Sequence, residues 1–304
     1  MREFGMTSIQ QALQEGIQRL QVRDGRGGEQ NPRLDAQVLL GHILQVPRAT
    51  LYAYPERELS VEQEKRFREL IERRARNEPV AYLVGEKEFY GRDFQVDARV
   101  LIPRPETELL VEAALKEARR RLDAGEMPVV ADVGTGSGVI PITLALEEPR
   151  LPVIYACDVS AEALEVARTN CQRYGVEERV ILLQSYLLQA LPQPVDMLLA
   201  NLPYVGTDEL PQMAPDVWNY EPHLALFSGP DGLGLLTRLC REARQYGMLR
   251  PGGWCVLEMG YLHQEPLTRL VKSLWPKADV ACISDYAGLD RHLVVRLPGS
   301  NQVS

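Results

Sequence analysis

The sequence predicts an α/β protein in which a doubly wound, seven-stranded mixed sheet follows an N-terminal helical bundle and a β-hairpin linker. Two observations support this prediction. Beyond about residue 128, short apolar runs alternate with amphipathic stretches of helical period, as in open sheets with helices on both faces. Before residue 85, helical periodicity dominates. With 304 residues, 45% of them hydrophobic, the chain can form a core in each of two domains.

Residues 1–84 are expected to form the helical bundle. Thr7 and Gln10 make the pattern of a capping box before a first helix, and Ser60 and Gln63 repeat it before a later one. A role for the bundle in docking a peptide or a protein stays open at this point. The apolar residues of the first helix recur at the spacing of one buried face: Ile9, Ala12, Leu13, Gly16, Ile17 and Leu20.

The charge balance disfavours a nucleic-acid clamp. The chain has 34 Lys and Arg against 42 Asp and Glu, a formal net charge of −8. The stretch from Glu56 to Glu78 holds seven acidic and seven basic residues, which favours a solvated helix face over a nucleic-acid-binding stripe. We therefore expect no direct nucleic-acid partner.

Residues 85–103 contain two short strand-like runs around Gly91 and predict a hairpin that links the bundle to a third part, residues 104–304. That part begins with a long helix, with Pro105 near its first turn and Gly125 just past its end. The last two strand-like runs are close enough in sequence to form an antiparallel pair at one edge. The expected strands are 128–133, 152–158, 179–184, 195–201, 253–259, 280–284 and 291–297.

The cysteines and histidines lack the spacings of metal sites and disulfide frameworks. The five cysteines are odd in number and include no Cys-x-x-Cys pair, so we expect buried free thiols in a reducing compartment and no metal. The N-terminal residues lack the apolar core of a signal peptide, and no apolar stretch is long enough to cross a bilayer. We expect a soluble, cytoplasmic protein without a membrane partner.

A glycine-rich turn, ADVGTGSGVI, follows the first expected strand of the sheet, where open α/β sheets bind ligands. Gly134, Gly136 and Gly138 allow a sharp turn and the close approach of a ligand. A dinucleotide fingerprint would require glycine in place of Val139, and no Gly-Lys-Ser/Thr run of a phosphate-binding loop is present.

The turn resembles motif I of the class I methyltransferases, which bind S-adenosylmethionine. Asp132 precedes the glycines, as an acid does in that motif. Asp158 ends the next expected strand, at the distance where the resemblance implies an acid that accepts both ribose hydroxyls of the donor. Ser160 follows as the cap of the next helix.

A second motif, LLANLPYVG, ends the fourth expected strand on the same rim of the sheet. The Asn201 side chain offers a donor and an acceptor to a planar NH2 group, and the carbonyl of Leu202 can accept its second N–H. Tyr204 can stack on such a flat group. These residues resemble the [DNS]PP[YFW] motif shared by methylases of adenine N6, cytosine N4 and glutamine amides, with Leu202 in place of the first proline and Pro203 as the second.

Longer stretches resemble the release-factor glutamine methyltransferases, the PrmC/HemK family. These stretches occur in the same order and at matching separations as in that family, and the resemblance covers the chain from about residue 8 to 297. The stretches are LDAQVLLGHIL, EPVAYLVGEKEFYGRDF, LIPRPETELLVE and NYEPHLALFSGPDGLGLL.

The resemblance implies specific roles. The catalytic motif carries over onto Asn201, Leu202, Pro203 and Tyr204. The family places an acidic residue and an aromatic near the adenine after the third strand, where this chain has Tyr186 and Leu187, so Tyr186 either supplies a ring there or belongs to the core. The cofactor-binding residues would be Asp132, Gly134, Thr135, Gly136, Ser137, Gly138, Asp158, Tyr186, Leu187 and Asn201.

The implied activity is methyl transfer from S-adenosylmethionine to the side-chain amide of the glutamine in the Gly-Gly-Gln motif of class 1 peptide-chain release factors. The bundle would hold the body of this protein partner, and we expect the enzyme to be a monomer. Three alternatives stay open: a ribosomal-protein glutamine methyltransferase, a nucleic-acid amino-methylase, and a donor-binding protein whose catalysis has decayed.

Overall fold

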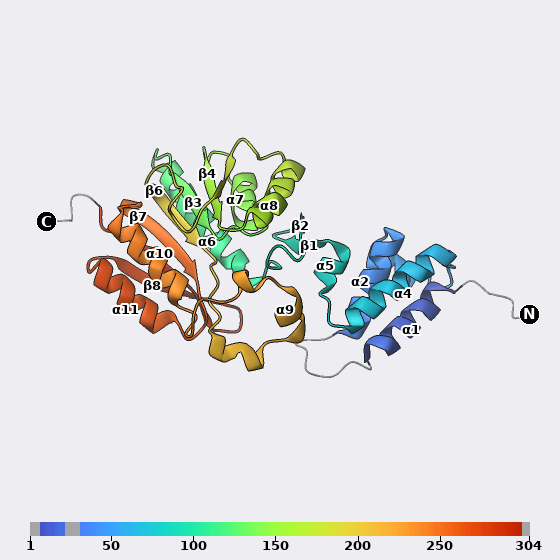
Figure 1. Ribbon diagram of the computed structural model, residues 1–304. Coiled ribbons are helices and arrows are strands. Elements are labelled where there is room, and N and C mark those ends of the chain that lie inside the picture. The colour runs from blue at the N-terminus through green and yellow to red at the C-terminus, as the bar shows by residue number, and fades with distance from the viewer. Residues whose placement is uncertain (1–6, 22–30, 300–304) are drawn as a thin grey trace, which may run out of the picture. The chain divides into compact units, whose positions relative to one another are not determined.

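The structure, a computed structural model, describes residues 7–21 and 31–299 (Figure 1). The chain divides into two compact units. The helical unit comprises Met1–Glu86 and Gln212–Glu221, and the α/β unit comprises Lys87–Pro211 and Pro222–Ser304. The segment Gln212–Glu221 thus belongs to the helical unit although the α/β unit surrounds it in the sequence.

Helices between residues 9 and 84 pack around one small core in the helical unit, and α9 (Pro215–Tyr220) adds no buried residue to it. Gly16 of the first helix permits a close approach to the fourth, since a Cβ at this position would lie 3.0 Å from Phe67 Cζ and 3.1 Å from Ile71 Cδ1. The expected apolar face is confirmed, with Ile9, Ala12 and Leu20 buried. The helices are α1 (Ile9–Gln21), α2 (Pro32–Leu44), α3 (Arg48–Ala53), α4 (Val61–Ala75), α5 (Val80–Val84) and α9 (Pro215–Tyr220).

One of the two predicted capping boxes is confirmed and the other is shifted by one residue. At α4, Ser60 Oγ accepts from Gln63 N at 3.2 Å and Gln63 Oε1 accepts from Ser60 N at 2.9 Å. The prediction of Thr7 for α1 is wrong, because Ser8 and Gln11 form that box. The Thr7 carbonyl instead accepts from the Leu59 N–H at 2.9 Å, which holds Thr7 outside the helix.

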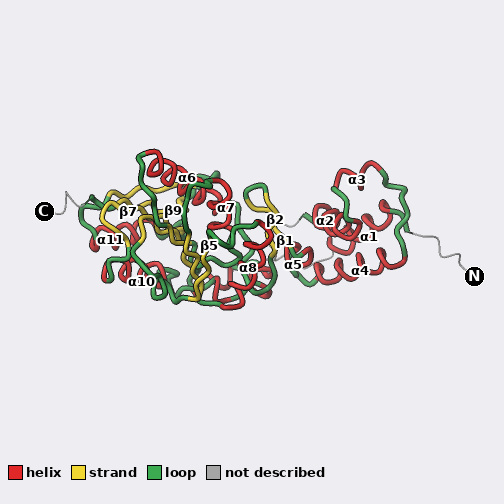
Figure 2. The backbone as a smooth tube through the Cα atoms, turned by 90° about the horizontal axis from the view of Figure 1, so that it is seen from above, coloured by secondary structure: helices red, strands yellow, loops and turns green. Residues whose placement is uncertain are grey.

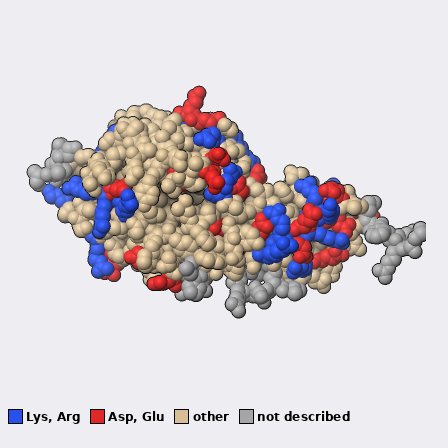
Figure 3. Space-filling view, viewed as in Figure 1, with Lys and Arg blue, Asp and Glu red and all other residues tan. Residues whose placement is uncertain are grey.

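Charges of both signs are interspersed over the helical unit on the face shown in Figure 3. Arg19 of α1 bonds Glu72 of α4 at 2.7 Å, and both side chains are exposed. The buried Arg74 side chain pairs with Asp35 at 2.7 Å. The first pair adds little stability, because exposed ion pairs are worth only about 0–1 kcal/mol.

The α/β unit contains the expected seven-stranded sheet, with strand order β5-β4-β3-β6-β7-β9-β8. Figure 2 shows strands of this sheet in yellow, among them β5, β7 and β9, with helices in red on either side. The first five strands are parallel, and β9 is antiparallel to both β7 and β8, so the predicted antiparallel pair at the edge is confirmed. The strands are β3 (Val130–Val133), β4 (Ile154–Asp158), β5 (Val180–Gln184), β6 (Val195–Ala200), β7 (Leu249–Glu258), β8 (Asp279–Ser284) and β9 (Asp290–Arg296).

Alternating side chains of the central strands supply a core on each face of the sheet. In β6, Leu198 and Ala200 face the core that α10 and α11 cover, whereas Met197 and Leu199 face the core that contains α6 and α7. Both faces are therefore covered by helices, which explains the almost continuous apolar runs of the central strands. The helices are α6 (Glu106–Asp123), α7 (Val139–Glu147), α8 (Ala161–Tyr174), α10 (Gly234–Gln245) and α11 (Gln264–Leu274).

A two-stranded sheet formed by β1 (Glu86–Phe89) and β2 (Arg92–Gln95) precedes α6. Phe89 and Phe94 are fully buried and belong to the core that contains α6 and α7, with their rings edge to face at 6.2 Å between centroids. The hairpin is therefore packed into the α/β unit through its aromatic residues.

All five cysteines are free, and four of them are buried. Burial raises the pKa of the Cys157 and Cys171 thiols to about 12, so these groups act as small apolar side chains. In the part of the chain that the structure describes, no helix has both the length and the apolar character needed to cross a membrane.

Candidate active site

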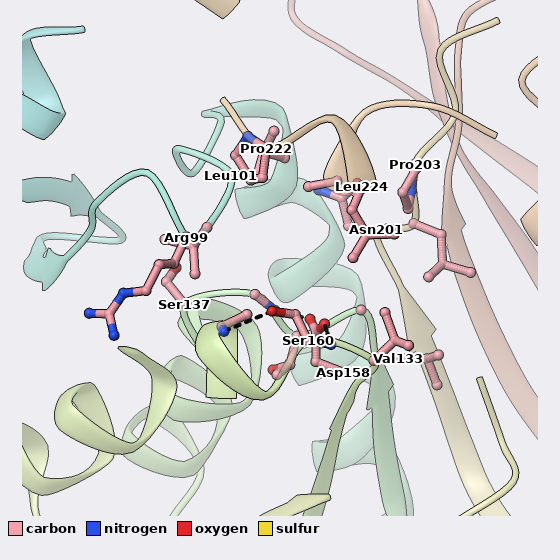
Figure 4. A pocket seen from close by; sticks show the side chains of 18 of the residues that line it. Arg99, Leu101, Val133, Ser137, Asp158, Ser160, Asn201, Pro203, Pro222 and Leu224 are labelled. Atoms are coloured by element: carbon pink, nitrogen blue, oxygen red, sulfur yellow. Dashed lines mark hydrogen bonds between the residues drawn. The ribbon is translucent and has the colours of Figure 1, made fainter. Parts of the chain in front are cut away.

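A cavity of about 390 Å³ lies in the α/β unit at the carboxyl ends of β3, β4 and β6. Its volume is in the usual range for small-molecule sites. Figure 4 shows Ser137, Asp158 and Ser160 on one side of the cavity and Asn201, Pro203 and Leu224 on the other. The structure therefore brings the two predicted motifs together around one space. Most lining residues lie in the segments 98–104, 133–140, 158–163, 185–187, 201–203 and 222–225, and Thr107 lines the cavity as well. Gly138, which the sequence motif predicts to bind the cofactor, is not among the lining residues.

The glycine turn connects β3 to α7 and is held by backbone groups. The N–H groups of Gly134 and Thr135 both donate to the Cys157 carbonyl, at 2.8 and 3.0 Å. Gly134 has φ +82°, and a Cβ there would lie 2.9 Å from Leu202 Cδ2. The position of Gly136, with φ +54°, has open space around it instead. One glycine therefore permits contact with the opposite loop, and the other leaves room for a ligand.

Asn170 of α8 fixes the far end of the turn, and the sequence analysis missed it. Its Nδ2 donates to the carbonyls of Ser137 at 2.9 Å and Gln95 at 3.0 Å, and its Oδ1 accepts from Gln95 N at 2.8 Å. Asn170 is fully buried. The only signal in the sequence is a single amide on the apolar face that Val166 and Ala167 form.

The side chain of Asp158 is held by the backbone. Oδ2 accepts from Gly136 N and Oδ1 accepts from Ser160 N, both at 2.9 Å. A carboxylate offers about four acceptor positions, so each oxygen keeps one for a ligand. Burial raises the pKa of Asp158, and the backbone N–H groups partly offset this. Ser160 caps α8 as expected, accepting from Ala163 N at 3.1 Å.

Asp132 is fully buried within β3 and is not among the residues that line the cavity. Neither of its carboxylate oxygens has a hydrogen-bond partner among the described residues. The hydroxyl of Thr135, also buried and unpartnered, is near enough to lower the pKa of Asp132 somewhat. Burial dominates, however, and raises the pKa of Asp132 to about 7.

The loop after β5 places both residues expected near the adenine at the cavity. Tyr186 and Leu187 line it, and Leu187 has φ +50°. Ser185 holds this conformation, because its Oγ donates to the Leu187 carbonyl at 2.9 Å. Tyr186 also packs against the core that contains α10, with the Arg238 guanidinium 4.5 Å from its ring centroid. Tyr186 therefore serves both the core and the cavity.

The residues after β6 divide into two groups. Asn201, Leu202 and Pro203 line the cavity. Tyr204 is absent from the lining, and its hydroxyl donates to Glu258 Oε1 at 3.4 Å. Burial raises the pKa of Tyr204, and the charge of Glu258 raises it further. The phenol is therefore a donor in this arrangement.

Two further polar residues that the sequence motifs did not identify support Asn201: Thr107, which also lines the cavity, and Glu258, which lies behind it. Asn201 Nδ2 donates to Thr107 Oγ1 at 3.0 Å, and the Thr107 hydroxyl donates to Glu258 Oε2 at 2.8 Å. Both partners are buried. Thr107 falls within the quoted stretch LIPRPETELLVE, but Glu258 ends β7 and lies outside every motif discussed above.

The segment from residue 222 to 236 supports the same loop from its other side. Val205 N donates to the Leu226 carbonyl at 3.0 Å, and the Val205 carbonyl accepts from Ser228 N at 3.1 Å. Gly232 lies so close that a Cβ there would overlap the Tyr204 carbonyl. Leu224, with 63% of its surface exposed, reaches the cavity from this segment.

Comparisons with known proteins match both units. The family models "PrmC N-terminal domain" and "Methyltransferase small domain" match residues 11–85 and 106–215. The release factor glutamine methyltransferase of Koribacter versatilis (strain Ellin345) is 40% identical, over 96% of this chain and 100% of that protein. The one from Moorella thermoacetica (strain ATCC 39073 / JCM 9320) is 42% identical, over 93% of this chain and 96% of that protein.

Solved structures match the fold at much lower identity. The hMettl16 catalytic domain in complex with MAT2A 3'UTR hairpin 1 has a TM-score of 0.56 and 15% identity, covering 87% of this chain and 94% of that chain. The complex with hairpin 6 has a TM-score of 0.55 and 14% identity, covering 81% of this chain and 84% of that chain. These likenesses concern the class I methyltransferase fold alone.

Proposed function

The chain belongs to the release factor glutamine methyltransferase family, and we propose that it methylates the glutamine of the Gly-Gly-Gln motif in class 1 peptide-chain release factors, at the side-chain nitrogen. The methyl donor would be S-adenosylmethionine. One observation carries the proposal: full-length relatives of this name share about 40% of their residues with this chain, across both units.

The cavity fits such a donor. It has space beside Gly136, free acceptor positions on Asp158 and apolar side chains such as Leu187 on its wall. We assign the ribose hydroxyls to Asp158 and the adenine to the region of Tyr186 and Leu187. When bound, the donor supplies an electrophilic methyl group on a sulfonium centre, so the protein has mainly to orient the acceptor nitrogen.

The acceptor side would orient that nitrogen with two oxygens. We assign one N–H of the substrate amide to Asn201 Oδ1 and the other to the Leu202 carbonyl. Leucine keeps the carbonyl that the motif's proline would supply, and its side chain packs toward Gly134, which gives the loop a steric support in place of the proline ring. Stacking by Tyr204 stays a prediction, since it requires the ring to turn from Glu258 toward the cavity.

We further propose that residues 1–84 form the docking domain for the release factor, joined by the hairpin linker 85–103 to the catalytic domain 104–304. A substrate held on two surfaces can bind well even when the contacts to its glutamine are few. The enzyme would act as a cytoplasmic monomer, with neither nucleic acid nor a membrane as its partner.

The test is transfer of labelled methyl from S-adenosylmethionine to a panel of purified acceptors. We expect label in a class 1 release factor and none when its motif glutamine is replaced by alanine. Comparable labelling of a ribosomal protein or of a DNA oligonucleotide would favour one of those substrate classes instead. Donor binding without transfer to any release factor would mean that catalysis has decayed.

A further inference from the structure

A chain of hydrogen bonds runs from the cavity into the core behind Asn201. Asn201 Nδ2 donates to Thr107 Oγ1 at 3.0 Å, and the Thr107 hydroxyl donates to Glu258 Oε2 at 2.8 Å. The three residues follow β6, begin α6 and end β7, respectively. Thr107 is 2% exposed and Glu258 is 1% exposed, so water does not compete for these bonds.

The chain has only one workable direction. A carboxylate only accepts hydrogen bonds, and a threonine hydroxyl has a single proton to donate. Because Thr107 gives this proton to Glu258, its oxygen can only accept from Asn201. The group of Asn201 that faces Thr107 must therefore be the NH2. If the Asn201 amide were flipped by 180°, its Oδ1 would face Thr107 Oγ1. Both oxygens would then be acceptors, with no proton between them.

We propose that Thr107 and Glu258 are positioning residues for methyl transfer: they fix the Asn201 amide so that its oxygen, Oδ1, is the group presented to the acceptor nitrogen. No described residue donates to Oδ1, which leaves it available for a substrate N–H. This inference rests on the proposed function. With the amide reversed, Asn201 would oppose the substrate NH2 with an NH2 of its own.

Glu258 supports the loop of residues 201–204 at a second point. Its Oε1 accepts from the Tyr204 hydroxyl at 3.4 Å, and His292 Nε2 lies 3.5 Å from its Oε2. His292 is fully buried and is paired with Glu258 in register between β7 and β9. The carboxylate thus contacts both ends of the four-residue motif, Asn201 through Thr107 and Tyr204 directly.

Kinetics of matched variants test the proposal. Thr107→Val keeps the shape but removes the hydroxyl, so we expect kcat for release-factor methylation to fall about 10- to 100-fold. The KM for the release factor and the Kd for S-adenosylmethionine should stay within about threefold, because valine keeps the shape of the threonine side chain where Thr107 lines the cavity. Thr107→Ser restores the hydroxyl and should restore kcat to within about threefold of the wild type.

A second variant and a control separate positioning from packing. Glu258→Gln should also lower kcat. The glutamine side chain can donate to Thr107 as well as accept from it, so the direction of the hydrogen bonds, and with it the orientation of the Asn201 amide, is no longer fixed. Thr143→Val removes another fully buried threonine hydroxyl, which has no hydrogen-bond partner among the described residues. This control should retain the wild-type kcat.

Nuclear magnetic resonance reads the amide itself. The chain has six asparagines, so selective ¹⁵N-asparagine labelling gives few side-chain signals, and Asn201→Ala identifies the relevant one. We expect one Asn201 Nδ2 proton to exchange slowly with solvent in the wild type and in Thr143→Val. In Thr107→Val the exchange should be about tenfold faster or more, because its acceptor is lost.

The outcomes are distinct. The inference is overturned if Thr107→Val has the kcat and the Asn201 amide exchange rate of the wild type. It is also overturned if Thr143→Val loses as much kcat as Thr107→Val does. A fall in kcat with faster exchange, rescued by Thr107→Ser, supports it. If the Asn201 Nδ2 proton of the wild type exchanges slowly but no release factor is methylated, the proposed function is overturned. The role of Thr107 and Glu258 in methyl transfer is then overturned as well.

Discussion

The two sides of the cavity are built in different ways. The donor side is made by backbone groups of one short turn and the end of the neighbouring strand, where Gly136 N and Ser160 N hold Asp158. The acceptor side depends on side chains distant in sequence, since Asn201 and Thr107 are 94 residues apart and Thr107 and Glu258 are 151 apart. A short motif can specify these contacts of Asp158, although Asn170 supports the turn from α8, whereas only the complete fold specifies the contacts of Asn201.

This comparison predicts that changes on the acceptor side affect turnover, and that changes on the donor side affect binding. The largest expected effect is that of Asn201→Ala. We expect kcat to fall about 100- to 1000-fold, because a preorganised polar group at the reacting atoms is lost. The Kd for S-adenosylmethionine, measured by calorimetry, should change less than about twofold.

Asn219→Ala is the matched control for this prediction, since Asn219 is exposed on α9 of the helical unit. It should retain the wild-type kcat at saturating release factor. A large rise in the donor Kd of Asn201→Ala would mean that Asn201 belongs to the donor side, and the division between the two sides would then fail.

The converse prediction concerns Asp158→Ala. We expect the donor Kd to rise about 10- to 100-fold, because the acceptors for the ribose hydroxyls are lost and Gly136 N is left without its partner. At saturating donor, kcat should stay within about threefold of the wild type. Asp279→Ala, at the exposed start of β8, serves as the control. Loss of kcat with an unchanged Kd would reverse the assignment of Asp158.

The buried acid of β3 makes the stability of the fold depend on pH. The pKa of Asp132 is raised to about 7 in the fold, from an ordinary value of 3.8, so the folded state favours the protonated acid. Its contribution to stability is therefore complete below about pH 4 and is lost as the pH rises through about 7.

Asp132→Asn removes this titration. We expect the variant to be more stable than the wild type at pH 8, on the order of 1–2 kcal/mol, since one pKa unit corresponds to about 1.4 kcal/mol and relaxation reduces part of the cost. Urea unfolding at pH 5 and pH 8 measures the difference. Equal pH dependence of the two proteins would show that Asp132 is paired or solvated in solution.

The smallest expected effect is that of Leu202→Pro, which restores the proline of the family motif. The carbonyl is retained and the loop gains a fixed φ, so we expect kcat to change by less than about threefold. A loss of more than tenfold would show that the contact of the Leu202 side chain with Gly134 matters more than the rigidity of the backbone. Steady-state kinetics at saturating donor distinguish the two outcomes.

The same division explains what could be predicted from the sequence. The alternation of apolar runs predicts the seven strands, because burial on both faces fixes the character of each strand. The short connection between the last two strands predicts the antiparallel pair at the edge. Gly134, Gly136 and Asp158 are identifiable because their spacing along a strand–turn–helix unit is local.

The supporting residues have no such local signature. Asn170 is one amide on an apolar helix face, and Glu258 is one acid at the end of a strand. The residues next to them in the sequence therefore do not predict their hydrogen-bond partners. The insertion of β9 between β7 and β8 likewise depends on long-range pairing. The position of the Tyr204 hydroxyl on Glu258 follows from the same contacts and could not be read from the motif itself.

If residues 201–204 present one glutamine amide to the donor, methyl transfer occurs at one nitrogen only. Tandem mass spectrometry of a class 1 release factor, after reaction with the wild-type protein and S-adenosylmethionine, locates the methyl group. We predict a single added methyl group on the side-chain nitrogen of the glutamine in the Gly-Gly-Gln motif, absent from the reaction with Asn201→Ala. A methyl group on another residue, or on that glutamine in both reactions, would contradict this role of residues 201–204.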